Sequence, residues 1–243
     1  MRLSNHMTTT FPDPRVTKAD FVRIMREHAA ADHLIAGRYG VGERDSFRGC
    51  AIGCGVETIN RLTGQRHRYD NYDAVANTLG IPLALAYLED RIFEGLGPEE
   101  RRTWPVRFAE AIPEEADLWP AVPRILARIL RELALPAVTV DEWGVKAAVE
   151  AVCRGLETGK GLESARAAAR VASAAAFAAR GAADTAANTA RAAVFAASAV
   201  VYAARAVVYA AGAVVYAVAC AARVPYPVTY SYIADIVIEE MGR

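Results

Sequence analysis

The feature that most constrains this chain is a segment of 60 residues, 163–222, in which alanine fills 30 positions. Alanine has the highest helix propensity and adds almost no side-chain volume, so the segment is predicted to be helical. A single helix of this length would span roughly 90 Å, too long for a compact chain of this size. We therefore expect it to fold back on itself. The predicted fold class is all-α, a multi-helix array with tightly packed alanine-rich C-terminal helices.

A seven-residue repeat near the end of this segment places aromatic side chains in register. Tyr202, Tyr209 and Tyr216 are seven residues apart, so they share one face of a continuous helix. The first interpretation is a packed core, in which the valines and tyrosines fill gaps between alanine-rich helices. The second is a ligand face, in which these tyrosines, with Arg191 and Arg205, bind a small anionic, nucleotide-like molecule by ring stacking and charge.

The segment that carries the tyrosine repeat is also considered as a membrane-spanning helix. Residues 206–222 are 17 consecutive uncharged residues, which is at the short limit for a membrane span. Alanine, glycine and tyrosine contribute little transfer free energy, so no membrane segment is expected. A structural or membrane-associated assembly protein, with the stripe as its seam, stays an alternative, and a homo-oligomer is expected.

The rest of the chain is expected to form a second, front helical domain. Residues 1–16 are predicted to be a flexible arm, 17–140 an N-terminal helical domain and 141–243 an alanine-rich helical domain. Thr17 has the spacing of an N-terminal helix cap to Asp20, and the helix that follows is expected to run to about residue 36.

The net charge and the first residues of the chain argue against some classes of function. The 28 basic residues balance the 28 acidic ones, so the chain has no overall field for a nucleic-acid polymer. The first 15 residues contain no apolar stretch of the kind found in signal peptides. We therefore expect a cytoplasmic protein that does not bind DNA or RNA.

The sequence GCAIGCG at residues 49–55 carries two cysteines four apart. Cys50 and Cys54 could share a helix face and bind zinc together with His28 and His33. The spacings match no familiar zinc module, and cysteine is often buried as a small apolar residue. Structural thiols are expected, with no metal and no cofactor; these four residues are the candidates if a metal is present.

Catalytic signatures are sparse. Glu89, Asp90 and Glu94 lie on one amphipathic helix, where such acids usually form a solvated face rather than an acid/base pair. The chain has no phosphate loop, dinucleotide-binding fingerprint, HExxH pair or nucleophile elbow. No catalytic residue is predicted, and an enzyme is not favoured.

Two stretches carry a resemblance. Residues 28–96, with GCAIGC at 49–54 and LEDRIFEGL at 88–96, resemble an uncharacterised group of small bacterial and bacteriophage proteins. The alanine-rich half is similar to the helical tail of proteins labelled as immunity proteins. The resemblance implies a mobile element or a conflict between defence and counter-defence, and it implies no reaction. Members of the group often have a histidine soon after the second cysteine, whereas Val56 and Glu57 occupy that place here.

These observations give one functional expectation and one alternative of another class. We expect a non-enzymatic, phage- or mobile-element-encoded binding protein that acts in immune evasion by sequestering a small anionic signalling ligand or a partner protein. The alternative is an enzyme that uses Cys50 and Cys54 with His28 or His33, with or without zinc.

Overall fold

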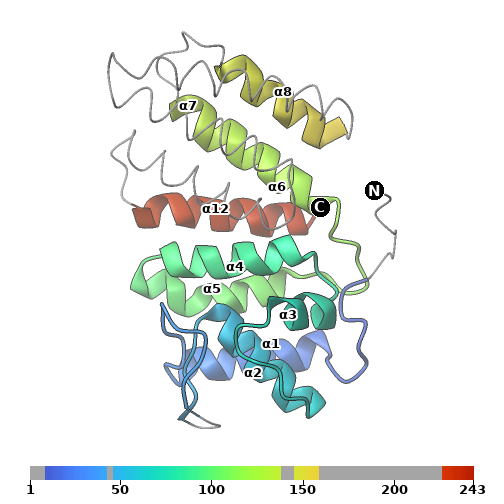
Figure 1. Ribbon diagram of the computed structural model, residues 1–243, viewed down its shortest axis with the longest axis vertical. Helices are drawn as coiled ribbons and strands as arrows, with labels where there is room; N and C mark the ends of the chain where they lie inside the picture. Colours follow the sequence, from blue (N-terminus) through green and yellow to red (C-terminus); the bar gives the residue numbers. More distant parts are fainter. Residues whose placement is uncertain (1–8, 43–45, 138–144, 159–225) are drawn as a thin grey trace. The chain divides into compact units, whose positions relative to one another are not determined.

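Helices make up the regular structure of the described residues. The structure is a computed structural model that describes residues 9–42, 46–137, 145–158 and 226–243. These residues contain helices and two isolated β-bridges but no strand, so the all-α prediction is confirmed for them (Figure 1). The chain divides into a first unit, residues 1–121 with 241–243, and a second unit, residues 122–240. Each unit is described by itself.

The first unit has five helices. They are α1 (Lys18–Ala30), α2 (Ala51–Thr63), α3 (Tyr72–Leu79), α4 (Leu83–Gly95) and α5 (Pro98–Ala111). Contacts join α1 to α2 and α5, and α4 to α2, α3 and α5. Large apolar side chains with almost no exposure fill the space between them: Met25, Phe47, Ile52, Ile59, Phe93 and Trp104.

Short polar residues begin two of these helices, and the cap at Thr17 confirms the prediction from the sequence. The Thr17 hydroxyl accepts a hydrogen bond from the backbone N–H of Asp20 at 3.1 Å, which satisfies one free donor of the first turn of α1. Asn71 caps α3 in the same way through the N–H of Ala74. The end of α1 differs from the prediction: it stops at Ala30 because Asp32 adopts a left-handed backbone conformation, with φ of 56°.

The segment between α1 and α2, residues 31–50, lies against the start of α2. Its ends are held by backbone hydrogen bonds, including Gly49 N–H to His33 O at 2.9 Å and Cys50 N–H to Arg38 O at 2.7 Å. The approach is so close that a Cβ on Gly53 would overlap the carbonyl oxygen of Tyr39. Glycine at this position is therefore what allows the segment to carry Tyr39 across α2.

The expectation of a solvated acidic face on α4 is wrong. Glu89 is 5% exposed and Asp90 is 8% exposed, while Glu94 is half-buried. The reason is that α4 contacts helices on several sides, α2, α3 and α5, so residues on more than one of its faces are covered. Buried carboxylates are costly unless they are hydrogen-bonded, paired or protonated, which makes them candidates for function.

The second unit contains α6 (Ala121–Ile129), the π-helical turn η2 (Leu130–Ala134), α7 (Leu135–Ala137), α8 (Val145–Thr158) and α12 (Tyr226–Met241). Ion pairs tie these helices together. Arg128 on α6 reaches Glu239 and Glu240 on α12 at 2.7 and 3.2 Å, and Arg131 pairs with Glu157 on α8. Glu240 is 1% exposed, so it is a buried acid that is supplied with arginine partners.

Two further predictions concern the membrane and the alanine-rich segment. In the part of the chain that the structure describes, no helix is both long enough and apolar enough to cross a membrane. Residues 163–222, with their predicted fold-back and tyrosine stripe, lie outside the described residues.

Candidate functional site

A cleft of about 720 Å³ lies at the C-terminal end of α2. Small-molecule sites occupy roughly 300 to 1,000 Å³, so the cleft has the size of one. Its walls come from α2, from the turn that follows α2 and from the 31–50 segment. The lining residues are Tyr39, Gly40, Glu57, Asn60, Gln65, Arg66, His67, Arg68, Tyr69 and Asp70.

Hydrogen bonds within the wall hold the cleft in shape. The side-chain amide of Asn60 accepts from the backbone N–H of His67 at 2.8 Å and donates to the His67 carbonyl at 3.1 Å. The Tyr69 ring packs on the buried Phe47 ring with centroids 4.7 Å apart, and its hydroxyl donates to Glu57 at 3.3 Å. Asn60 and Glu57 of α2 thus hold the turn in place in the absence of a ligand.

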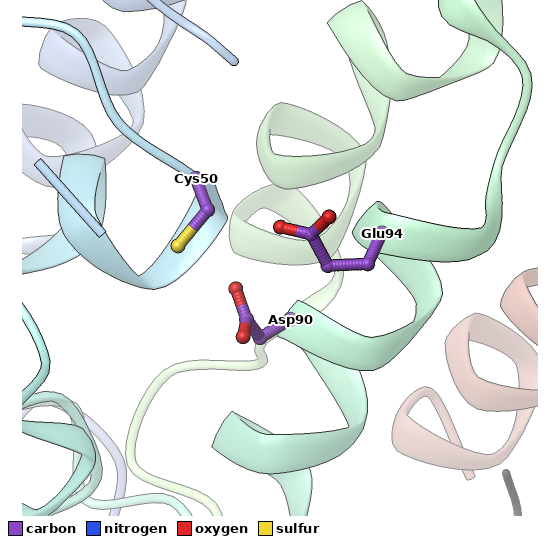
Figure 2. A group of neighbouring side chains, drawn as sticks. All are labelled: Cys50, Asp90 and Glu94. Atoms are coloured by element: carbon purple, nitrogen blue, oxygen red, sulfur yellow. The ribbon is translucent and has the colours of Figure 1, made fainter. Parts of the chain in front are cut away.

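The second feature is a cluster of Cys50, Asp90 and Glu94. Cys50 precedes the first turn of α2, and the two acids lie one turn apart on α4, so they project from the same side of that helix. The Cys50 sulfur and one carboxylate oxygen of each acid all lie within 4.8 Å of one another. Figure 2 shows the sulfur and both carboxylates directed toward a common space.

Asp90 has one oxygen with a partner and one without. Its Oδ2 accepts a hydrogen bond of 2.5 Å from the Tyr72 hydroxyl, while its Oδ1 is buried and has no hydrogen-bond partner among the described residues. The Tyr72 ring is stacked on Tyr87 with centroids 4.1 Å apart, which fixes the donor in place. Burial and the neighbouring Asp90 raise the pKa of Tyr72, so its hydroxyl keeps the proton that it donates.

Glu94 ties the cluster to the 31–50 segment. Both of its carboxylate oxygens accept from the backbone N–H of Gly37, at 2.9 and 3.0 Å. Two residues further on, the Tyr39 hydroxyl lies 3.4 Å from the Tyr72 hydroxyl, and it is the donor of this bond because Tyr72 gives its one proton to Asp90. The segment that supplies Tyr39 to the cleft is therefore bonded to the same two residues, Glu94 and Tyr72, that surround the cluster.

The thiols of α2 are not activated by their surroundings. Burial raises the pKa of Cys50, and the negative charge of Asp90 raises it further. Burial also raises the pKa of Cys54. Because the thiolate is the nucleophile, both side chains are poor nucleophiles in this environment unless a cation replaces the thiol proton.

The histidines named by the sequence form a pair of their own. His28 Nδ1 lies 3.2 Å from His33 Nδ1, so one ring nitrogen donates to the other. His28 is 1% exposed, and burial lowers its pKa to about 3, with smaller contributions from Arg61 and His33. The Cys54 thiol points to the Gly49 carbonyl at 3.6 Å. Among the described residues, His28, His33 and Cys54 do not join Cys50 in a group with metal-ligand spacing.

Sequence reasoning missed the partners of Cys50. The available signal was the run LALAYLEDRIFEG, an apolar helix in which Asp90 and Glu94 are separated by one turn. What the sequence could not give was the neighbour, because Cys50 and Tyr72 come from other helices. The predicted ligand-binding residues Arg191, Tyr202, Arg205, Tyr209 and Tyr216 lie outside the described residues.

Comparisons with protein-family models, with curated proteins and with solved structures give no match to this chain.

Proposed function

We propose that the protein is a non-enzymatic binding protein that sequesters a small anionic ligand with a planar ring, of the nucleotide class. The observation that carries this proposal is the composition of the cleft, where an exposed tyrosine ring faces a space that arginine and histidine side chains also line. The context of phage immune evasion, the cytoplasmic location, a protein partner and a homo-oligomer are parts of the same proposal that rest on the sequence alone.

Ring stacking is the first part of the argument. Tyr39 is 46% exposed although its backbone is packed tightly against α2, so the ring is presented to solvent from a fixed position. Its ring meets the Tyr72 ring nearly at a right angle, with centroids 6.1 Å apart and planes at 86°, so Tyr72 helps to fix the orientation of the Tyr39 ring. Stacking of a base on an aromatic side chain contributes about 1 to 3 kcal/mol.

Charge is the second part. The two acids that line the cleft each have an arginine: Glu57 bonds to Arg61 at 3.0 Å and Asp70 to Arg68 at 3.0 Å. The exposed Arg66 then adds one positive charge to the lining. A guanidinium offers several N–H donors in one plane, which suits the oxygens of a phosphate or carboxylate.

Calorimetric titration of the full chain with cyclic nucleotides, ADP-ribose and related anions tests this function. We expect one of these ligands to bind and to be recovered unchanged after denaturation of the protein. Arg66→Ala should weaken binding about tenfold or more, because it removes a charged hydrogen-bond donor. Arg102→Ala, which removes an exposed arginine of α5, is the matched control and should leave the affinity unchanged.

Two outcomes would contradict parts of this proposal separately. Failure of every ligand in the panel to bind would overturn the function. Binding that survives Arg66→Ala but is lost in Arg205→Ala would keep the function and move the site to the alanine-rich segment. The alternative of a cysteine-dependent enzyme gains no support from the described residues, since burial raises the pKa of both thiols.

A further inference from the structure

We infer that Cys50, Asp90 and Glu94 form a binding site for one thiophilic divalent cation, of which Zn²⁺ is the expected representative. This site is separate from the ligand cleft and does not depend on the proposed function. It also differs from the metal candidates that the sequence suggested, since it shares only Cys50 with them.

The first argument is the unpartnered oxygen of Asp90. Asp90 is 8% exposed, and its Oδ1 is a buried acceptor with no hydrogen bond among the described residues. Figure 2 shows an oxygen of this carboxylate directed into the space between the Cys50 sulfur and the Glu94 carboxylate. A buried acceptor that stays unsatisfied costs about 1 to 3 kcal/mol, so native proteins rarely leave one without a partner. A cation in this space would bind it.

The second argument is the donor set. Thiolate sulfur and carboxylate oxygen are both zinc ligands, at about 2.3 and 2.0 to 2.2 Å from the metal, which places neighbouring ligands about 3.5 Å apart. The three donor atoms lie within 4.8 Å of one another, so binding one zinc ion requires them to approach by about 1 Å. Calcium and magnesium prefer oxygen ligands, so the sulfur selects against them.

The third argument is the support around the ligands. Metal-bound carboxylates are usually held by hydrogen bonds from a second layer of residues. Here the Tyr72 hydroxyl holds Asp90, and the Gly37 backbone N–H holds Glu94. Asp90 is thus oriented with its Oδ1 left for a cation, and the two Glu94 oxygens share one N–H donor, so each keeps a lone pair for a cation.

Proton release balances the binding step. The Cys50 thiol gives up its proton to solvent as the sulfur–metal bond forms, and the carboxylates bind as anions. One thiolate and two carboxylates carry three negative charges against two on the metal, so the bound site has a net charge of −1. With three protein ligands, the fourth tetrahedral position is open to water or to an anionic ligand.

The site also has a consequence for the neighbouring cleft. Glu94 bonds to Gly37, and Asp90 is linked through Tyr72 to Tyr39, so a bound metal fixes the segment that presents the Tyr39 ring. We therefore expect metal binding to tighten ligand binding in the cleft, although the metal site itself can be tested without any ligand.

Titration of the metal-free full chain with Co²⁺ tests the inference, because a cobalt–thiolate bond gives a near-ultraviolet charge-transfer band and tetrahedral cobalt gives visible bands. We expect saturation at one equivalent in the wild type. Cys50→Ser should lose the charge-transfer band, and Glu94→Gln should weaken binding at least tenfold. Glu94 is only half-buried, so the second variant tests the site even if Cys50→Ser fails to fold, which circular dichroism would report.

Cys54→Ser is the matched control. It removes a second buried thiol of the same helix, four residues away, that lies outside the cluster, and it should keep the wild-type spectrum. Absence of a one-equivalent complex in the wild type would overturn the inference. So would a charge-transfer band that survives in Cys50→Ser, or one that Cys54→Ser removes as completely as Cys50→Ser does.

Discussion

The acids of helix α4 and the acids of the second unit meet positive charge to different degrees. In the second unit, Arg128 bonds to Glu132 at 3.0 Å and to Glu240 at 3.2 Å, and Arg124 adds a bond of 3.0 Å to Glu240. The guanidinium of Arg128 lowers the pKa of Glu132, and that of Arg131 lowers the pKa of Glu157. Glu132 and Glu157 are thus favoured in the ionised form by a fixed positive charge.

The first unit provides much less positive charge to the acids of α4. Burial raises the pKa of Glu89, and the charge of Asp90 raises it further. Burial also raises the pKa of Glu94, although the Gly37 N–H acts in the other direction. The difference teaches that an acidic side chain on α4 needs a proton or a cation, whereas an acid of the second unit is stabilised by an arginine. A metal at the Cys50–Asp90–Glu94 cluster would supply what the second unit gets from its arginines.

The largest effect on stability is expected at Gly53, where α2 packs directly against the 31–50 segment. Gly53→Ala places a Cβ on the Tyr39 carbonyl, so either α2 or the 31–50 segment must move. We expect a loss of about 3 kcal/mol or more in the free energy of unfolding, measured by urea denaturation. Gly55→Ala is the control, because its Cβ would make ordinary contacts with Val75 Cγ2 at 3.6 Å and Phe21 Cζ at 4.0 Å, and alanine has the better helix propensity. Equal stability of the two variants would contradict the close approach.

The next largest effect on stability is expected from the ion pairs of the second unit. Arg128→Ala leaves Glu240, which is 1% exposed, with Arg124 as its remaining arginine. We expect a loss of about 1 to 3 kcal/mol in the free energy of unfolding. Arg23→Ala breaks two ion pairs on exposed side chains of α1 and should leave that free energy nearly unchanged. A similar loss in both variants would mean that burial does not distinguish these networks.

A smaller effect on the free energy of unfolding is expected from His28, a buried base of the first unit. His28 has a pKa of about 3 in the folded state against 6.5 in the unfolded chain, so the unfolded state takes up a proton first as the pH falls. The free energy of unfolding should then drop below pH 6.5 by up to about 1.4 kcal/mol per pH unit. His28→Gln should reduce this slope between pH 6.5 and 4.5. Parallel slopes for wild type and His28→Gln would contradict the burial of a neutral imidazole.

Local sequence signals predicted the fold class and the start of α1. The structure confirms the Thr17 cap, because capping preferences act within a few residues. The end of α1 was missed, since the left-handed conformation of Asp32 is set by the packing of the segment after it.

The cluster could be predicted only in part. The one-turn spacing of Asp90 and Glu94 is visible in the sequence, but their burial depends on helices α2, α3 and α5 packing around α4. Gly53 allows the 31–50 segment, which ends at Cys50, to lie close to α2. Its role can be seen only when the position of Tyr39 is known. Tertiary contacts of this kind have no local signature, which is why the same acids were predicted to be solvated.

The central claim is that Asp90 and Glu94 of α4 bind a metal cation, whereas the acids of the second unit bond to arginines. Thermal unfolding of the full chain, with a chelator and then with excess Zn²⁺, compares wild type with Asp90→Asn. We predict that Zn²⁺ at about 100 times its dissociation constant adds about 2.7 kcal/mol to the wild type, and that Asp90→Asn loses this gain. With the chelator, Asp90→Asn should be at least as stable as the wild type, because it removes a buried charge. An equal response to Zn²⁺ in both proteins, or none in the wild type, would contradict the account.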